Sequence, residues 1–320
     1  MYTIPSAQDI RNCHERIKPY IIQTPLKRSQ EIDEYVGAEV WFKCENLQKV
    51  SAFKARGALN AVLQLSPEEL NRGLVTHSSG NHAQALAFAG NIQGVKTWVV
   101  MPETAPKIKI DKVTSLGAKI IFCKNTPEER QKEADKIVTK HGATFVHPFD
   151  NDHVIIGQAT VGKEILEEKP DIQAVIPPVG GGGLLSGTGL SAHYFGKDCK
   201  VYAAEPDGAA DAIYSFETGR VEKAKFVNTI ADGLQTHLSK RTLNLIRAHV
   251  ENIFLVSDDE ILHAMRLLNK HLNQAVEPSA AVSFAALIRN KAHFKNTKVG
   301  VILTGGNIDN QLKQEYLGFS

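Results

Sequence analysis

The chain has 320 residues, 42% of them apolar, and its 37 Lys and Arg against 35 Asp and Glu leave a formal net charge of +2. This length allows one large or two ordinary domains around a buried core, and the balanced charge, with no basic segment among aromatic residues, argues against binding of nucleic acid or an anionic membrane. No apolar run approaches the roughly 20 residues of a membrane span, and no signal-peptide pattern is present, so we expect a cytoplasmic protein whose partner is a small molecule. The four cysteines lie far apart without a C-x-x-C pair, which argues against a zinc site and a disulfide framework.

The first part of the chain is predicted to contain a helix, a strand and a second helix. Ser6 is expected to cap a helix that has Asp9 as its third residue. Apolar and polar residues alternate over 40–44, which predicts a strand, and the apolar positions within 58–63 predict a helix. Lys54 therefore lies at a junction between a strand and a helix.

Lys54 stands among small and apolar residues in the sequence SAFKARG, residues 51–57. Burial disfavours the ammonium form of such a lysine, and the neutral amine is a nucleophile that forms Schiff bases with carbonyl compounds. Taken alone, however, this heptapeptide favours a solvated lysine at the start of a helix. The rest of the sequence has to decide between the two interpretations.

From residue 74 onward, a pattern of apolar strand, small-residue or proline turn and amphipathic helix repeats. We predict strands at 74–76, 97–101, 119–123 and 144–147 with helices near 81–92, 105–116 and 126–141, and then strands at 174–178, 200–205, 253–256 and 298–303. Parallel strands joined by right-handed crossovers are the natural arrangement of such units. The sequence thus predicts an α/β protein of two doubly wound open-sheet lobes with a cleft between them: a large domain of 1–72 and 148–320, and a small domain of 73–147.

Four consecutive glycines, Gly180 to Gly183, come directly after a predicted strand and before a helix. Without side chains, their backbone N–H groups can converge on an anion at the positive end of the helix. A merely flexible loop is the weaker interpretation. A dinucleotide fingerprint fits less well, because Gly187 and Gly189 would lie inside the helix rather than at the turn. The run therefore predicts a site for a single phosphate group.

Two further polar loops follow predicted strands, at residues 76–82 and 303–307. The first has hydroxyl, amide and imidazole groups that can bind a carboxylate, although it also fits an ordinary capped helix start. The second has a threonine followed by two glycines. Because open α/β sheets bind ligands at the carboxyl ends of their strands, the three loops are expected to share one crevice.

Seven motifs carry a resemblance to a known family. The segments SAFKARGALNAV, HSSGNHAQAL, PPVGGGGLLSG, AAEPDGAAD, TIADG, VEPSAA and LTGGN resemble those of fold-type II pyridoxal-phosphate enzymes, in particular the serine racemases and the threonine and serine dehydratases. The resemblance runs from about residue 5 to residue 309 with the motifs in family order. It implies the tryptophan synthase beta-like fold, pyridoxal 5'-phosphate in the cleft and a homodimer.

The resemblance also implies cofactor contacts. Lys54 would form the Schiff base with the cofactor, Phe53 would pack against its ring, Asn81 would contact its 3-hydroxyl and Thr304 its pyridine nitrogen. The phosphate would be held by Gly180, Gly181, Gly182, Gly183 and Leu184, and Gly233 and Glu277 would complete the cofactor site. A neutral hydroxyl such as that of Thr304 does not keep the ring nitrogen protonated, which tempers the electron sink and suits elimination or prompt reprotonation.

The activity implied is removal of water and ammonia from small β-hydroxy amino acids of the threonine and serine type, with Lys54 as the general base. Ser78, Asn81, His82 and Thr236 would contact the amino-acid substrate. Ser79 is a serine as in serine racemases, whereas many dehydratases have alanine there. Because some 3-hydroxyaspartate dehydratases keep this serine, racemisation of serine as a second or main activity and dehydration of threo-3-hydroxyaspartate both remain open.

Three further interpretations remain. The resemblance implies that Arg130 can bind a distal carboxylate of the substrate, and the equal alternative is a surface arginine paired with its acidic neighbours. Glu205, Ala209 and Asp211 align with the divalent-cation site of the racemase group, for Mg²⁺, Ca²⁺ or Mn²⁺, whereas without the resemblance they would be a solvated acidic loop. A non-catalytic amino-acid or nucleotide sensor is the alternative of another class, and the intact Lys54 argues against it.

Overall fold

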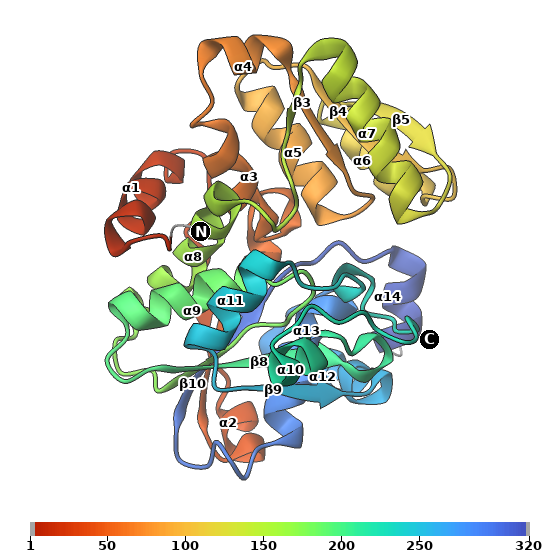
Figure 1. The fold of residues 1–320 in the computed structure, drawn as a ribbon. Coiled ribbons are helices and arrows are strands. Elements are labelled where there is room, and N and C mark those ends of the chain that lie inside the picture. Colours follow the sequence, from red (N-terminus) through yellow and green to blue (C-terminus); the bar gives the residue numbers. More distant parts are fainter. Residues whose placement is uncertain (1–3, 318–320) are drawn as a thin grey trace.

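The computed structural model describes residues 4–317, and within them the strands form two sheets (Figure 1). A six-stranded sheet has the order β1-β2-β10-β7-β8-β9 and a four-stranded sheet the order β5-β4-β3-β6. Each pair of neighbouring strands is parallel except β1 and β2. The predicted α/β fold with parallel sheets is confirmed.

The six-stranded sheet is covered by helices on both faces. Its strands are β1 (Leu26–Lys27), β2 (Glu39–Cys44), β7 (Ala174–Ile176), β8 (Lys200–Pro206), β9 (Asn252–Val256) and β10 (Lys298–Leu303). The helices α2 (Gln30–Val36), α12 (Asp258–Leu272) and α13 (Pro278–Arg289) pack on one face. The helices α8 (Asp152–Glu168), α9 (Gly183–Phe195), α10 (Ala212–Thr218) and α11 (Lys240–His249) pack on the other.

The four-stranded sheet forms the upper part of Figure 1 with its own helices. Its strands are β3 (Leu74–His77), β4 (Thr97–Pro102), β5 (Lys119–Cys123) and β6 (Thr144–Phe145). The helix α7 (Pro127–His141) covers one face, and α5 (Asn81–Ile92) and α6 (Lys107–Ser115) cover the other. The short helix α4 (Pro67–Arg72) precedes β3.

Two strands end earlier than predicted. The strand β7 ends at Ile176 because Pro177 and Pro178 have no N–H group to donate to the neighbouring strand. In the same way β6 ends at Phe145, after which only Val146 N–H still donates to the carbonyl of Val75, before Pro148. Both strands thus end where the chain turns toward the cleft.

The N-terminal helix α1 (Ala7–Ile17) has the predicted capping box, in which the side chains of Ser6 and Asp9 each accept a backbone N–H of the other residue. Between β2 and α3 (Lys54–Val62), however, lie two 3₁₀ turns that the pattern did not predict, η1 (Glu45–Leu47) and η2 (Lys49–Ser51). Val50 and Ser51 have φ of 53° and 54°, a left-handed conformation that is costly for a β-branched residue. The chain is therefore strained immediately before Lys54.

The remaining elements lie in the C-terminal half, as η3 (Asp207–Ala209), η4 (Asp232–Leu234) and α14 (Asn310–Leu317). The apolar face of α3 shares a core with α5 and β3, so the domain boundary near residue 72 stays a prediction. The four cysteines are free thiols and three of them are buried. Within residues 4–317, no helix has both the length and the apolar character that crossing a membrane requires.

Candidate active site

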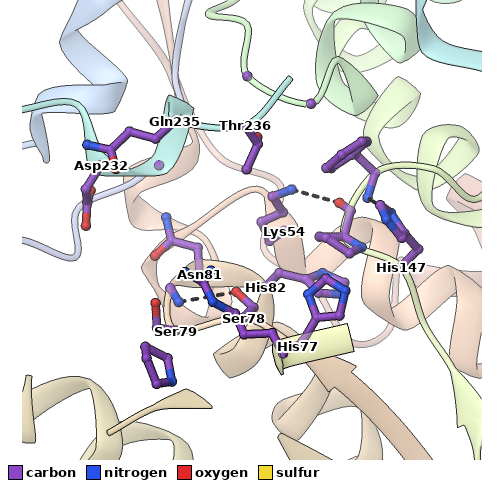
Figure 2. Close-up of a pocket in the computed structure, with 18 of the residues that line it drawn as sticks. Lys54, His77, Ser78, Ser79, Asn81, His82, His147, Asp232, Gln235 and Thr236 are labelled. Carbon is purple, nitrogen blue, oxygen red and sulfur yellow. Dashed lines mark hydrogen bonds between the residues drawn. The ribbon is translucent and has the colours of Figure 1, made fainter. Parts of the chain in front are cut away.

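A cavity of about 1440 Å³ lies where the polar loops after β3, β7 and β10 meet (Figure 2). Every residue predicted to contact cofactor or substrate lines it: Phe53, Lys54, Ser78, Ser79, Asn81, His82, Arg130, Gly180, Gly181, Gly182, Gly183, Leu184, Gly233, Thr236, Glu277 and Thr304. The structure therefore brings these residues together, while their individual roles stay predictions. Glu205, Ala209 and Asp211 lie outside the cavity lining.

Lys54 is the first residue of α3, and the segment before it is bound to the end of β10. The N–H of Phe53 donates to the carbonyl of Thr304 at 3.1 Å, and the N–H of Gly306 donates to the carbonyl of Ser51 at 2.9 Å. Ala52 forms an antiparallel bridge with Gly305. These backbone bonds place the lysine segment beside the C-terminal loop that was predicted to share its crevice.

The Lys54 amine is held among groups that are neutral at physiological pH. Its Nζ donates to the carbonyl oxygen of Pro148 at 2.8 Å, and burial lowers its pKa from 10.5 to about 8. Burial also lowers the pKa of His82 to about 3 and that of His147 to about 4, with a smaller contribution from the Lys54 charge. At pH of about 8, half of the Lys54 amine is therefore unprotonated. A nucleophile or a base requires this free form.

The glycine run, predicted to hold a phosphate group, has no room for side chains. Gly182 has φ of +86° and caps α9, a left-handed conformation for which glycine is suited. A Cβ atom on Gly181 would lie 2.2 Å from the Phe149 ring, and one on Gly182 would lie 2.8 Å from Leu238. Backbone N–H groups at a helix N-terminus bind phosphate, so this loop and Lys54, in one cavity, fit pyridoxal phosphate.

Asn81 is oriented by two residues from the far end of the chain. Its Nδ2 donates to Oε1 of Glu277 at 2.7 Å, and its Oδ1 accepts from Nδ2 of Asn307 at 2.8 Å. Asn307 also donates to the carbonyl of Val50 at 2.8 Å, which helps to hold the strained turn. Burial raises the pKa of Glu277 to about 7. The sequence motifs predicted roles for Asn81 and Glu277 but none for Asn307.

Arg130 lies on α7 and lines the cavity. Its Nη2 donates to Oδ1 of Asn125 at 2.9 Å, and its Nε is buried with no hydrogen-bond partner among the described residues. Within 4–317, no acidic side chain pairs with Arg130, and its neighbour Glu129 instead pairs with Lys132 at 3.0 Å. The geometry therefore favours a ligand contact over the surface-arginine interpretation.

The predicted cation residues form a separate buried group. The carboxylate of Glu205 accepts the N–H groups of Asp211, Ala212 and Ile213 at 2.9, 2.6 and 3.0 Å, so it caps α10. Oδ2 of Asp211 is buried without a hydrogen-bond partner among residues 4–317. Over the same range no cluster of three or more His, Cys, Asp or Glu suits a metal ion. Two carboxylates, a carbonyl and waters would have to complete such a site, which stays a prediction.

The sequence patterns did not predict a role for the segment His147-Pro148-Phe149, which lines the cavity beside the glycine run. The Nδ1 atom of His147 accepts the N–H groups of Phe149 and Asp150 at 3.3 and 2.9 Å, which makes it a neutral imidazole. The signal was present, because these residues follow a strand of the small sheet just as residues 78–82 do. Because the predicted strand continued to His147, these residues were not recognised as a loop that follows a strand.

The chain belongs to the family of pyridoxal-phosphate dependent enzymes, whose family model matches residues 17–305. More particularly, it is 44% identical over 306 residues to the serine racemase of Dictyostelium discoideum, with 94% of each chain covered. It is 43% identical over 306 residues to the beta-hydroxyaspartate dehydratase of Paracoccus denitrificans (strain Pd 1222), covering 96% of this chain and 97% of that one. The structure of maize serine racemase superposes with a TM-score of 0.95 at 37% identity, covering 99% of this chain and 98% of that one. The resemblance stated from the motifs and the pyridoxal phosphate cofactor are thereby confirmed.

Proposed function

We propose that this enzyme is an ammonia-lyase for small β-hydroxy amino acids that prefers threo-3-hydroxyaspartate and also interconverts the enantiomers of serine. Arg130 carries the substrate preference, because its buried Nε has no hydrogen-bond partner among the described residues and the side chain lines the cavity. A guanidinium binds a carboxylate through paired hydrogen bonds. The similarity to a beta-hydroxyaspartate dehydratase supports the same preference.

Different residues of the cavity would bind different parts of the cofactor and of the substrate. The glycine run would hold the cofactor phosphate, Phe53 and Asn81 its ring, and Lys54 its carbonyl carbon. When bound, pyridoxal phosphate supplies an electron sink that stabilises negative charge at the substrate α-carbon. Ser78 and the N-terminal N–H groups of α5 would hold the α-carboxylate, since a helix N-terminus favours an anion.

Lys54 then acts as the general base. Its free amine takes the α-proton at Nζ, which the lowered pKa of about 8 permits near neutral pH. The β-hydroxyl leaves with a proton as water, and the unsaturated amino acid that remains is hydrolysed to a 2-oxo acid and ammonia. For racemisation the α-carbon must instead receive a proton on the opposite face, and the hydroxyl of Ser79, in the same cavity, would deliver it.

A panel of L-threonine, L-serine, D-serine and threo-3-hydroxyaspartate tests the proposal, with the 2-oxo acid and the chirality of the remaining substrate measured in each case. We expect the highest kcat/KM for threo-3-hydroxyaspartate and slow interconversion of L- and D-serine. A clear preference for L-threonine would contradict the substrate assignment and leave the ammonia-lyase chemistry standing.

Three further properties belong to the same proposal. We infer a divalent cation at Glu205, Ala209 and Asp211, supported by two buried carboxylates whose pKa values burial raises to about 7, since a cation would offset their charge. We further propose a homodimer, which the resemblance implies, and a cytoplasmic location. Sedimentation of the purified enzyme would test the dimer.

A further inference from the structure

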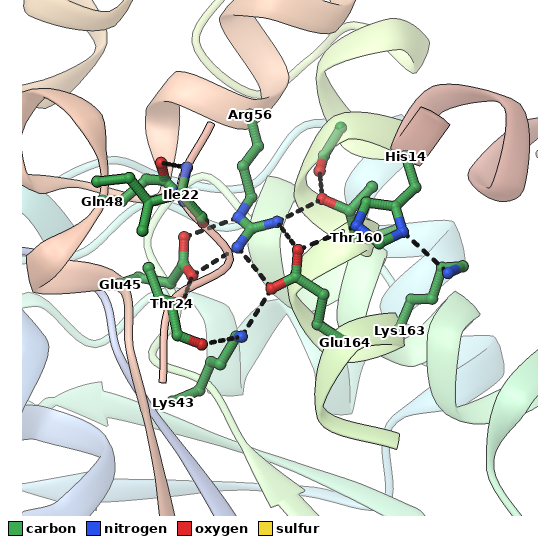
Figure 3. Close-up of polar contacts among 12 residues, drawn as sticks. His14, Ile22, Thr24, Lys43, Glu45, Gln48, Arg56, Thr160, Lys163 and Glu164 are labelled. Atoms are coloured by element: carbon green, nitrogen blue, oxygen red, sulfur yellow. Dashed lines mark hydrogen bonds and ion pairs between the residues drawn. The ribbon is translucent and has the colours of Figure 1, made fainter. Parts of the chain in front are cut away.

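Outside the cavity lining, four charged side chains form a group that we call the Arg56 cluster, whose Glu164 also contacts His14 Nε2 at 3.1 Å (Figure 3). It consists of Lys43, Glu45, Arg56 and Glu164, each no more than 1% exposed at its side chain. Two cations face two carboxylates, so the cluster carries no net charge. A buried ion that lost its partner would be strongly unfavourable, and the cluster therefore holds its members in one arrangement.

The Arg56 guanidinium uses all five of its N–H donors in this arrangement. Nε and Nη2 donate to the two oxygens of Glu45, each at 2.8 Å. Nη1 and Nη2 donate to the two oxygens of Glu164 at 2.6 and 2.8 Å, and Nη1 also donates to Thr160 at 3.2 Å. Because a carboxylate is bound at each of two edges of the guanidinium plane, the guanidinium has a single orientation.

The cluster joins three elements around Lys54. Glu45 lies in η1, Arg56 in α3, and Thr160 and Glu164 in α8. Lys43 Nζ completes it from β2, at 2.6 Å from Glu164. The helix α8 begins a few residues after Pro148, whose carbonyl accepts from Lys54. The cluster thus links α3 to the helix that follows the segment facing the lysine.

Lys54 and Arg56 point to different sides of α3. At about 100° per residue, two positions along a helix are about 200° apart, so Lys54 enters the cavity while Arg56 faces α8 and β2. The helices α3 and α8 also touch without intervening side chains, because a Cβ atom on Gly157 would lie 2.5 Å from Cα of Gly57. Because Lys54 and Arg56 belong to the same helix, a rotation of α3 about its axis would move both side chains at once.

We propose that Arg56 is a positioning residue for Lys54: its two-sided grip on Glu45 and Glu164 sets the rotation of α3 and thereby the direction in which the lysine amine enters the cavity. The inference rests on the proposed role of Lys54 as cofactor-bearing residue and base. Backbone bonds to β10 hold the chain before Lys54, and the Arg56 cluster supplies a second point of attachment after it. A misplacement of about 1 Å at a reacting group lowers a rate by about 100-fold.

The test compares two variants that weaken the same cluster from different elements. Arg56→Lys keeps the positive charge on α3 but loses the fork, whereas Lys43→Gln removes a charge from β2 and leaves Arg56 intact. Each holoenzyme is measured for its thermal midpoint, for the absorbance of the imine between Lys54 and the cofactor as a function of pH, and for kcat and KM. Glu45→Gln, which removes the charge of one of the two carboxylates bound by Arg56, is measured in the same way.

We expect Arg56→Lys to shift the pH at which the imine band titrates and to lower kcat by about 10- to 100-fold, with a smaller change in KM. Lys43→Gln should lower the thermal midpoint at least as much but leave the imine titration and kcat close to wild type. Equal loss of kcat in both variants, or an unchanged imine titration in Arg56→Lys, would show that the cluster is merely structural.

Should Arg56→Lys fail to fold, Glu45→Gln decides, because it removes the charge on one side of the Arg56 grip: a shifted imine titration supports the positioning role and an unchanged one overturns it. The imine band is independent of the substrate. A wild-type enzyme that forms the imine but dehydrates no hydroxy amino acid would therefore refute the proposed function without touching this inference.

Discussion

Lys54 donates a hydrogen bond from Nζ to the carbonyl oxygen of Pro148 at 2.8 Å, although 94 positions separate the two residues. The contact joins the start of α3 to the segment between β6 and α8. The same segment carries Phe149 against the glycine run. One lysine is therefore within reach of groups from both sheets, as a residue that both bears a cofactor and moves protons requires.

Replacement of Lys54 by alanine should abolish both elimination and racemisation, because the same amine bears the cofactor and takes the α-proton. Cofactor should still bind in part through the phosphate cradle. Loss of the imine absorbance, residual cofactor after gel filtration, and formation of 2-oxo acid are the measurements. Wild-type turnover by Lys54→Ala without added amine would remove the basis of the proposed mechanism.

Activity should rise with pH through about 8, the lowered pKa of Lys54, because only the free amine accepts a proton. In the cofactor-free protein the lowered pKa has a second effect. Between about 8 and 10.5 the unfolded chain binds the Lys54 proton more tightly than the folded one, so stability rises with pH in that window. Urea unfolding gives the free energy of unfolding of the cofactor-free wild type and of Lys54→Met. The difference between the two free energies should change with pH over this range and stay constant below it.

Ser79→Ala should separate the two activities. Removal of the α-proton by Lys54 serves both, whereas only racemisation needs a proton on the opposite face. We expect L-to-D conversion of serine and turnover of D-serine to be suppressed, with elimination from an L-substrate largely retained. Racemisation at the wild-type rate in Ser79→Ala would show that another group delivers the second proton.

Arg130→Ala should raise KM for threo-3-hydroxyaspartate by about 10- to 100-fold, the value of a hydrogen bond to a charged group, and change that for L-threonine by much less. Lys132→Ala is the matched control, since Lys132 lies on the same helix and lines the same cavity but pairs with Glu129. An equal rise in KM for the two substrates in Arg130→Ala would show that Arg130 does not bind a distal carboxylate.

A chelator should lower the thermal midpoint, and Mg²⁺, Ca²⁺ or Mn²⁺ should restore it, because a ligand that binds only the folded state stabilises it. Asp211→Asn should abolish this response. It is a cleaner variant than Glu205→Ala, which would also remove the cap of α10. Asp207→Asn, at an exposed acid of the same loop, is the control, and an unchanged chelator response in Asp211→Asn would place the cation elsewhere.

The sequence alone was sufficient to predict the α/β fold, the capping box of α1, most strand positions and part of the cavity lining. These features are local: hydrophobic period, caps and glycine at strand ends depend on residues a few positions apart. Parallel topology then places the ends of successive strands at one edge of a sheet. The glycine run, the loop at 78–82 and Thr304 could be brought together on that basis.

The tertiary structure alone decided which of these groups touch. It also decided that Arg130 lines the cavity and donates to Asn125. Nothing near Lys54 in the sequence indicates that the Pro148 carbonyl accepts a hydrogen bond from its amine. Nor does the sequence indicate that Asn307 orients Asn81 or that Arg56 binds two carboxylates at once. Such partners are distant in the chain, and their distances and the pKa values that burial shifts exist only once the whole core has packed.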